Sequence, residues 1–282
     1  YYCCYNNNCY YYEYRCLCFP LFHGKGKINI LIKVSRKMKN VINLYKPVGL
    51  SPLQVIEKFR LKHREYGKVK LGYAGRLDPM AEGVLMVLVG DENKKIRDYL
   101  KFDKEYRAEI LIGLKSDSCD VLGIVEKCKV VEVDEKVLKK KLKMMKGNYE
   151  QKIPKYSSYR VRGHPMFYYA LRGKSVADVK NVVEIKDVRI NSIYKIGSGK
   201  LLKYVLNKID LVDGNFRQEE IKKKWAGLLK GSENRFLVVD VSLDVSSGTY
   251  IRAISEDIGG LLLSLKRTRV GEFDSRKSEK LK

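Results

Sequence analysis

From residue 40 onward, the apolar residues of this chain switch repeatedly between the period of a β-strand and that of an α-helix. The clearest strand is 239–245, where apolar and polar residues alternate, and residues 106–112 alternate in the same way. Short apolar runs at 41–45 and 83–89 predict two more strands. Because hairpin-length gaps occur beside helical crossovers, we expect an α/β (α+β) fold with a mixed, mostly antiparallel sheet flanked by helices.

N-terminal caps and apolar stripes predict four helices. The first follows Ser51, with proline at its first helical position, and the second follows Asp134 and ends at Gly147. The third begins at a capping-box-like Asn215-x-x-Gln218 pair, and the fourth follows Gly248-Thr249. Their predicted buried stripes are Val55, Ile56 and Phe59; Leu138, Leu142 and Met145; Ile221, Trp225 and Leu228; and Ile251, Ile254, Ile258 and Leu261.

The chain carries a large excess of basic side chains. It has 57 Lys+Arg against 33 Asp+Glu, a formal net charge of +24. Such an excess favours a polyanionic partner. Nucleic acid is preferred over a membrane surface, because no basic amphipathic helix with an aromatic face occurs. No run reaches about 18 apolar residues, which excludes a transmembrane helix.

Residues 1–37 differ from the rest of the chain. Residues 1–14 contain seven tyrosines and three consecutive asparagines, with no helical or strand period. The segment also lacks the cleavage site of a signal peptide. We expect either an extension translated in front of a true start at Met38 or a genuine disordered tail, and we prefer the first.

Cysteine usage is equally uneven, with five of the seven cysteines in the first 18 residues. Their spacing contains no C-x2-C pair, so no metal site is expected there. Only Cys119 and Cys128 remain in the rest of the chain, so we do not expect a disulfide framework. We therefore expect a cytoplasmic location.

The densest motif is residues 72–83, Gly-Tyr-Ala-Gly-Arg-Leu-Asp-Pro-Met-Ala-Glu-Gly. Three glycines in this run allow a sharp bend and a close approach to a ligand. Pro79 holds the preceding Asp78 extended, so the loop presents one carboxylate, which suits nucleophilic catalysis. By itself, the spacing is also compatible with a plain Asp-Pro turn.

Together with five other segments, this motif resembles the TruB family of tRNA pseudouridine synthases, whose motif is Gly-His-x-Gly-x-Leu-Asp-Pro-x-Ala-x-Gly. The resemblance spans roughly residues 40–273 in the family order. It implies the pseudouridine synthase fold, a catalytic domain over 38–282 and a basic RNA-binding insertion within 124–174. The other segments are 43–51 with a Lys-Pro-x-Gly turn, 103–108 with Lys-x-Tyr followed by 113–120, 153–158 with Pro-x-Tyr-Ser, 247–252 with Gly-Thr-Tyr-Ile-Arg, and the closing strand 265–271.

The resemblance implies isomerisation of uridine 55 in the T loop of tRNA to pseudouridine, without a cofactor or metal. Asp78 would attack the nucleoside, so that uracil can detach, rotate and rejoin the ribose through carbon. Tyr106 would stack on the flipped base and is a candidate for taking the C5 proton. Arg252 would form a charge-assisted pair with Asp78 and hold it ionised. The residues expected to bind RNA are Lys46, Tyr73, Gly75, Leu77, Tyr156, Thr268, Lys139, Lys140 and Lys143.

The pattern alone leaves plainer interpretations open for these residues. Tyr106 also fits a core position on a strand, and Arg252 fits a surface charge. The N-terminal end of a helix disfavours a cation, however, so an arginine there suggests a carboxylate partner. Asp117 and Asp120 could be a magnesium pair, but a turn feature is preferred because further ligands are lacking.

A basic segment supports RNA binding independently of the resemblance. Residues 127–174 contain 14 Lys+Arg against four acidic residues, and Lys139, Lys140 and Lys143 lie away from the apolar stripe of their helix. A charge run is often only a solvated face, but aromatic residues and arginines follow at 156–169, as is typical of RNA binding. The resemblance places this segment over the T arm of tRNA, where the target base must leave its stack.

Three features depart from the family pattern. Tyr73 replaces the usual histidine, and segment 195–234, which contains Trp225, exceeds the minimal core without a functional account. No carboxy-terminal PUA domain follows Phe273, so weakened tRNA affinity is expected. Two alternatives remain: a guide-RNA-dependent enzyme of the dyskerin branch, and a catalytically silent RNA-binding or tRNA-folding protein. We expect a monomer with no obligatory protein partner.

Overall fold

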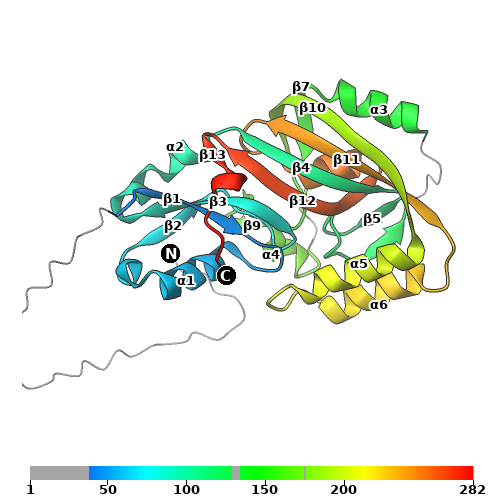
Figure 1. Ribbon diagram of the computed structural model, residues 1–282. Helices are drawn as coiled ribbons and strands as arrows, with labels where there is room; N and C mark the ends of the chain where they lie inside the picture. The colour runs from blue at the N-terminus through cyan, green and yellow to red at the C-terminus, as the bar shows by residue number, and fades with distance from the viewer. Residues whose placement is uncertain (1–37, 129–133, 175, 282) are drawn as a thin grey trace, which may run out of the picture. The chain divides into compact units, whose positions relative to one another are not determined.

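The computed structural model describes residues 38–128, 134–174 and 176–281 (Figure 1). The unit Lys39–Lys282 contains a nine-stranded sheet with the order β1-β3-β12-β4-β11-β10-β7, to which β2 and β13 are added at β3 and β12. Its strands are β1 (Val41–Lys46), β2 (Leu71–Ala74), β3 (Ala81–Val89), β4 (Lys104–Ile112), β7 (Gly147–Lys152), β10 (Lys180–Gly197), β11 (Arg235–Val245), β12 (Gly260–Val270) and β13 (Phe273–Asp274). Within the described residues, β12 and β3 run parallel and the other pairs of this sheet are antiparallel, which confirms the predicted fold class.

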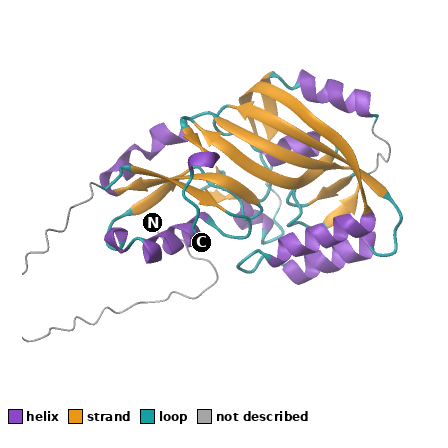
Figure 2. Cartoon of the chain, in the orientation of Figure 1, coloured by secondary structure: helices purple, strands orange, loops and turns teal. Residues whose placement is uncertain are grey.

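Helices and two small hairpins surround this sheet, as Figure 2 shows. The hairpins pair β5 (Leu114–Ser116) with β6 (Val125–Lys127) and β8 (Arg160–Val161) with β9 (His164–Pro165). The helices are α1 (Pro52–Lys62), α2 (Ile96–Leu100), α3 (Glu135–Met144), α4 (Met166–Ala170), α5 (Ser198–Asp210), α6 (Gln218–Leu229) and α7 (Ile251–Asp257), with short 3-10 helices at Arg64–Tyr66, Gly90–Lys95 and Ser275–Lys277.

Both faces of the sheet are covered at its centre. On β4, Leu111 packs in the hydrophobic cluster that contains α5 and α6, whereas Ile110 and Ile112 pack in the cluster that contains α3 and α7. On β11, Val238 and Val239 divide in the same way. Successive residues of a strand point to opposite faces of the sheet. A strand whose two faces are both covered therefore needs apolar residues at odd and at even positions alike. This explains why burial at the end of β4 is continuous rather than alternating.

Helix α1 confirms its sequence signals. Ser51 is the N-cap, its side chain accepts from the Gln54 N–H, and the Gln54 side chain accepts in return from the Ser51 N–H. This reciprocal capping box satisfies two backbone donors at the start of the helix.

Two of the predicted helices end earlier than expected. Helix α7 ends at Asp257, and Leu261, predicted on its stripe, belongs to β12. Gly259 has a left-handed φ of 85°, the conformation that commonly follows a helix end. Helix α3 likewise ends at Met144, so Gly147 is the first residue of β7 rather than a helix stop.

The predicted capping box at the start of α6 is wrong. Its N-cap is Arg217, which has a left-handed φ of 62° and no side-chain cap. The Gln218 side chain instead accepts from the Phe216 N–H and donates to the carbonyls of Val212 and Gly214, because the preceding turn supplies closer partners. The third buried residue of the stripe is Leu229 rather than Leu228.

Segment 195–234, for which the sequence predicted no function, contains the end of β10 and the antiparallel α5–α6 hairpin, which lies at one face of the sheet (Figure 1). Trp225 is fully buried there, and its indole N–H donates to the Val121 carbonyl at 3.2 Å. In the part of the chain that the structure describes, no helix has the length and apolarity needed to span a membrane. The predictions for residues 1–37 lie outside the described residues.

Candidate active site

Asp78 lies in the loop between β2 and β3, and a buried lysine, Lys46, bonds to the backbone of this loop. Lys46, at the end of β1, is fully buried, and its ammonium donates to the carbonyls of Pro47, Pro79 and Ala81 at 2.9, 3.4 and 2.6 Å. Burial lowers the pKa of Lys46 to about 7, while the Asp78 carboxylate opposes the shift. The expectation that Lys46 binds RNA is wrong, because its ammonium is inaccessible and already bonded within the protein.

A second buried cation, which the sequence analysis did not single out, holds the other end of this loop. Arg267 on β12 is 1% exposed and donates to the carbonyls of Gly75 and Val84 at 3.0 and 2.7 Å. Gly75 has a left-handed φ of 81°, as the sharp bend requires. Gly83 allows β12 to approach, since a Cβ there would lie 2.1 Å from the Arg267 carbonyl oxygen.

The predicted pair of Asp78 and Arg252 is present. Arg252, the second residue of α7, places Nε 2.9 Å from Asp78 Oδ2, and its side chain is 6% exposed. The pairing is not a two-pronged fork, because the terminal guanidinium nitrogens donate to the carbonyls of Ser118 and Tyr156 at 2.9 and 3.0 Å. Asp78 itself keeps 35% exposure. The arginine therefore fixes one side of a carboxylate that remains accessible.

A second carboxyl group adds to the electrostatics around Arg252. Burial raises the pKa of the Asp120 carboxyl, and the Arg252 guanidinium opposes that shift. Burial by itself would lower the pKa of Arg252, but Asp78 and Asp120 outweigh this effect and raise it. Arg252 thus stays charged between two acidic groups.

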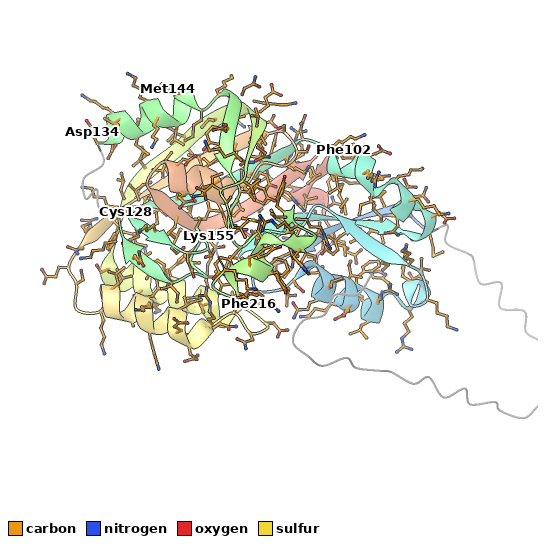
Figure 3. The ribbon with its side chains drawn as sticks, turned by 180° about the vertical axis from the view of Figure 1, so that it is seen from behind. Phe102, Cys128, Asp134, Met144, Lys155 and Phe216 are labelled. Atoms are coloured by element: carbon orange, nitrogen blue, oxygen red, sulfur yellow. The ribbon has the colours of Figure 1, made fainter. Side chains whose placement is uncertain are left out.

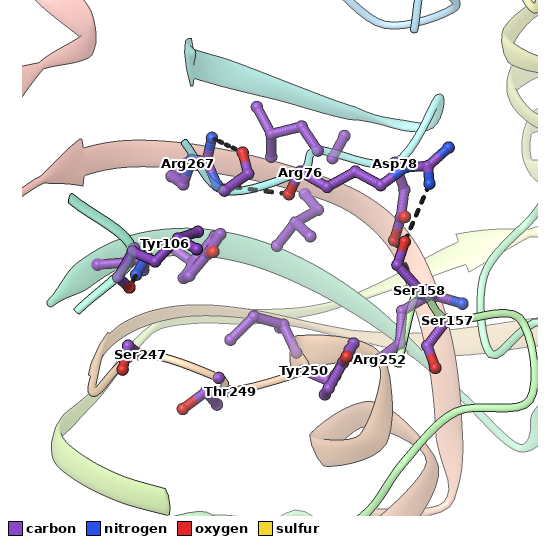
Figure 4. A pocket seen from close by; sticks show the side chains of 18 of the residues that line it. Arg76, Asp78, Tyr106, Ser157, Ser158, Ser247, Thr249, Tyr250, Arg252 and Arg267 are labelled. Atoms are coloured by element: carbon purple, nitrogen blue, oxygen red, sulfur yellow. Dashed lines mark hydrogen bonds and ion pairs between the residues drawn. The ribbon is translucent and has the colours of Figure 1, made fainter. Parts of the chain in front are cut away.

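Asp78 and Arg252 lie on the wall of a cavity of about 420 Å³ (Figure 4). This volume falls in the range of about 300–1,000 Å³ that is typical of small-molecule sites. Besides this pair, the lining includes Arg76, Leu77, Tyr106, Ser158, Thr249, Tyr250 and Arg267. The β2–β3 loop, β4, α7 and β12 therefore converge on one hollow.

Tyr106 lies on β4 in the wall of this cavity, 8% exposed. It pairs in register with Arg267 on β12 and packs in the cluster that contains α3 and α7. Both interpretations of its pattern hold in part, since the ring is a core residue that also borders the cavity.

The other residues implied by the resemblance divide between the cavity and its surroundings. Gly75 and Leu77 line it. Tyr73 is half-buried on β2 and packs against the hydrophobic cluster beneath α1. Thr268 lies at a β-bulge of β12, and Tyr156 lies behind Arg252 with its hydroxyl 3.3 Å from Asp117 Oδ2. Apart from Lys46, the RNA-binding roles stay predictions.

The basic helix α3 is separate from the cavity lining. Figure 3 shows it from behind, with Asp134 and Met144 at its two ends. Its lysines 139, 140 and 143 are exposed, while Leu138 and Leu142 pack into the core. The helix thus presents a basic face to solvent.

The β8–β9–α4 segment carries a group of stacked side chains. The His164 ring lies 4.3 Å from that of Tyr168 at an interplanar angle of 12°, and the Arg172 guanidinium lies 3.7 Å from the centre of the same tyrosine ring. Arg76, two residues before Asp78, donates to Ser158 Oγ at 2.9 Å and so joins the Asp78 loop to this segment. Arg76 is the one arginine within the motif at residues 72–83, and this is the sequence signal for a cation close to Asp78.

Asp117 and Asp120 are occupied by protein donors. Asp117 accepts from the Ile124 N–H and from Arg217, and Asp120 accepts from the Ser118 hydroxyl and the Leu122 N–H. This bonding supports the turn interpretation. Among the described residues, no group of three or more His, Cys, Asp or Glu side chains is arranged to hold a metal ion.

The sequence of the chain is similar to those of known proteins. Residues 62–201 match the model of the "TruB family pseudouridylate synthase (N terminal domain)". The chain is 30% identical over 240 residues to tRNA pseudouridine synthase B of Malacoplasma penetrans, covering 83% of this chain and 85% of the relative. It is 31% identical over 245 residues to tRNA pseudouridine synthase B of Caldanaerobacter subterraneus, covering 84% and 71%.

The fold is also found in a solved structure, a chain of the "Cbf5-Nop10-Gar1 Complex", with a TM-score of 0.51 and 19% identity. That match covers 86% of this chain and about half, 52%, of the other. The fold and the sequence relatives place the chain in the enzyme class of pseudouridine synthases. Within that class, it belongs to the TruB family.

Proposed function

We propose that this enzyme converts uridine 55 in the T loop of tRNA to pseudouridine. The observation that carries the proposal is the accessible Asp78 carboxylate, fixed by buried Arg252 on the wall of a cavity that Tyr106 borders. Relatives 30% and 31% identical are named tRNA pseudouridine synthase B. The net charge of +24 suits a polyanionic substrate.

The chemistry exchanges one bond to the ribose for another. The target uridine leaves its stack and enters the cavity. Asp78 attacks C1′ as the nucleophile, so that a bond between its carboxylate oxygen and C1′ forms while the bond between N1 and C1′ breaks. The uracil then turns, and a bond forms between C5 and C1′ while the bond between Asp78 and C1′ breaks, which returns the free carboxylate. The proton on C5 is removed, with Tyr106 as the candidate acceptor, and N1 ends protonated. Atoms and charge balance within the nucleotide, so the reaction requires no oxidant or cofactor.

Arg252 supports this chemistry through geometry and charge. Its contacts with the carbonyls of Ser118 and Tyr156 hold the guanidinium in place before substrate arrives. A preorganised cation beside the Asp78 carboxylate holds its orientation and does not have to reorganise during the reaction.

The test is to incubate the purified protein with an unmodified tRNA transcript and map pseudouridine by nucleotide position. We expect modification at position 55, and none in a transcript carrying cytidine there. Activity that appears only after a guide RNA is added would instead support the dyskerin-type alternative. Tight tRNA binding without any pseudouridine would support a silent RNA-binding protein.

A further inference from the structure

The turn between α5 and α6, residues 211–217, contacts the surroundings of both members of the Asp78–Arg252 pair. This turn belongs to the segment that exceeds the minimal family core. Figure 3 labels Lys155 and Phe216, which directly precede Tyr156 and Arg217 in the chain, and the Arg217 guanidinium lies over the Tyr156 ring.

On one side, the turn packs against the support of the Asp78 loop. The Gly49 N–H donates to the Pro79 carbonyl at 2.8 Å, next to Asp78 in the chain. The Asp213 N–H donates to the Gly49 carbonyl at 3.1 Å. The approach is so close that a Cβ on Gly49 would lie 2.0 Å from the Leu211 carbonyl oxygen.

On the other side, the turn reaches the support of Arg252. Arg217 Nη2 lies 2.9 Å from Asp117 Oδ2, and its guanidinium lies 5.3 Å from the centre of the Tyr156 ring. The Tyr156 carbonyl is an acceptor of Arg252. The Arg217 side chain therefore bonds to Asp117 and also covers Tyr156, whose carbonyl orients Arg252.

We propose that Arg217 is a positioning residue: by clamping Asp117 and Tyr156, it lets the α5–α6 turn fix Arg252 relative to the Asp78 loop. The inference rests on the proposed function, since it concerns the geometry of that reaction. Arg217 is not among the residues that line the cavity, and its described partners are Asp117 and Tyr156, so it acts through Tyr156 rather than on the substrate.

The backbone of Arg217 supports a role beyond a surface ion pair. Its φ of 62° is unfavourable for a non-glycine residue, and glycine would adopt it without strain. Its side chain is 34% exposed and that of Asp117 33%, whereas fully exposed pairs contribute little to stability. A strained residue that engages two partners suits a positioning role.

This backbone makes a sharp test available. Arg217→Gly removes the guanidinium but relaxes the turn, so the melting temperature should stay the same or rise. We expect kcat for pseudouridine formation to fall about 10- to 100-fold, because small misplacements of reacting groups have effects of this size. The KM for tRNA should remain unchanged. Arg217→Lys should retain part of kcat, since it keeps the charge but loses the planar guanidinium over Tyr156.

Lys224→Ala on the exposed face of α6 is the matched control and should leave kcat unchanged. In a double-mutant cycle with Asp117→Asn, the losses in kcat should be less than additive, because both changes break the same contact. An Arg217→Gly protein with normal kcat, or one whose kcat falls only as its melting temperature falls, would overturn the positioning role. If the wild-type protein formed no pseudouridine, the proposed function itself would fail before the variants were compared.

Discussion

Arg252 Nε lies 2.9 Å from Asp78 Oδ2, while its two terminal nitrogens are held by the carbonyls of Ser118 and Tyr156. The arginine is therefore fixed by the backbone of two other segments before it meets the aspartate. A guanidinium with five donors in a rigid fork can hold such a three-way arrangement, which a lysine cannot reproduce. The orientation of the candidate nucleophile thus depends on three parts of the chain at once.

Asp78→Asn should abolish isomerisation, with kcat falling by at least about 10⁴-fold, because the change removes the nucleophile and preserves the side chain's size. Binding of tRNA should persist in a filter-binding assay. The exposed Asp91→Asn serves as a control for the loss of one negative charge elsewhere. Pseudouridine formation by Asp78→Asn at near wild-type rate would contradict the assignment.

Arg252→Gln should lose both activity and stability. The Arg252 guanidinium opposes the rise that burial causes in the pKa of Asp120, so removing the cation withdraws a favourable interaction with that buried carboxyl group and should lower the unfolding free energy. The double variant Arg252→Gln with Asp120→Asn should recover part of that stability in urea unfolding, but no activity. Equal stability of the single and double variants would show that the two groups are not coupled.

Lys46 should make stability depend on pH. Its pKa is lowered from 10.5 to about 7 by burial, so between these values the unfolded chain binds the proton more strongly than the folded chain. The unfolding free energy of the wild type, relative to Lys46→Met, should therefore rise with pH across this window, by about 1.4 kcal/mol per unit. Urea unfolding at pH 6, 7.5 and 9 measures this slope, with the exposed Lys101→Met as control. A flat difference would contradict the burial of an ammonium at this position.

The basic face of α3 should contribute to tRNA binding through phosphate contacts. Replacing Lys139, Lys140 and Lys143 with Gln should weaken binding and flatten its dependence on salt, by up to about three units of slope if all three contact phosphate. Turnover at saturating tRNA should change little, because none of the three lines the cavity. The same charge change at Lys200, Lys203 and Lys224 on the α5–α6 hairpin is the matched control. Equal effects of the two triple variants would indicate a general charge effect rather than a binding face.

Local sequence signals determined the elements and the presentation of Asp78. Ser51, Pro52 and Gln54 specify the start of α1 through contacts within one turn, and alternation specifies β11, because these signals depend on near neighbours. The glycine and proline pattern predicted the loop that carries Asp78. Arg252 could be assigned a carboxylate partner, because a cation near the start of a helix is unfavourable without one.

The tertiary structure decided which groups surround these elements. The sequence treats Lys46 as one more basic residue, but the fold buries it beneath the Asp78 loop, where backbone carbonyls replace water around its ammonium. Arg267 obtains its role in the same way, from the Gly75 and Val84 carbonyls far along the chain. Backbone carbonyls are present at every residue and leave no mark in the sequence, so only the folded chain determines which of them a given cation meets.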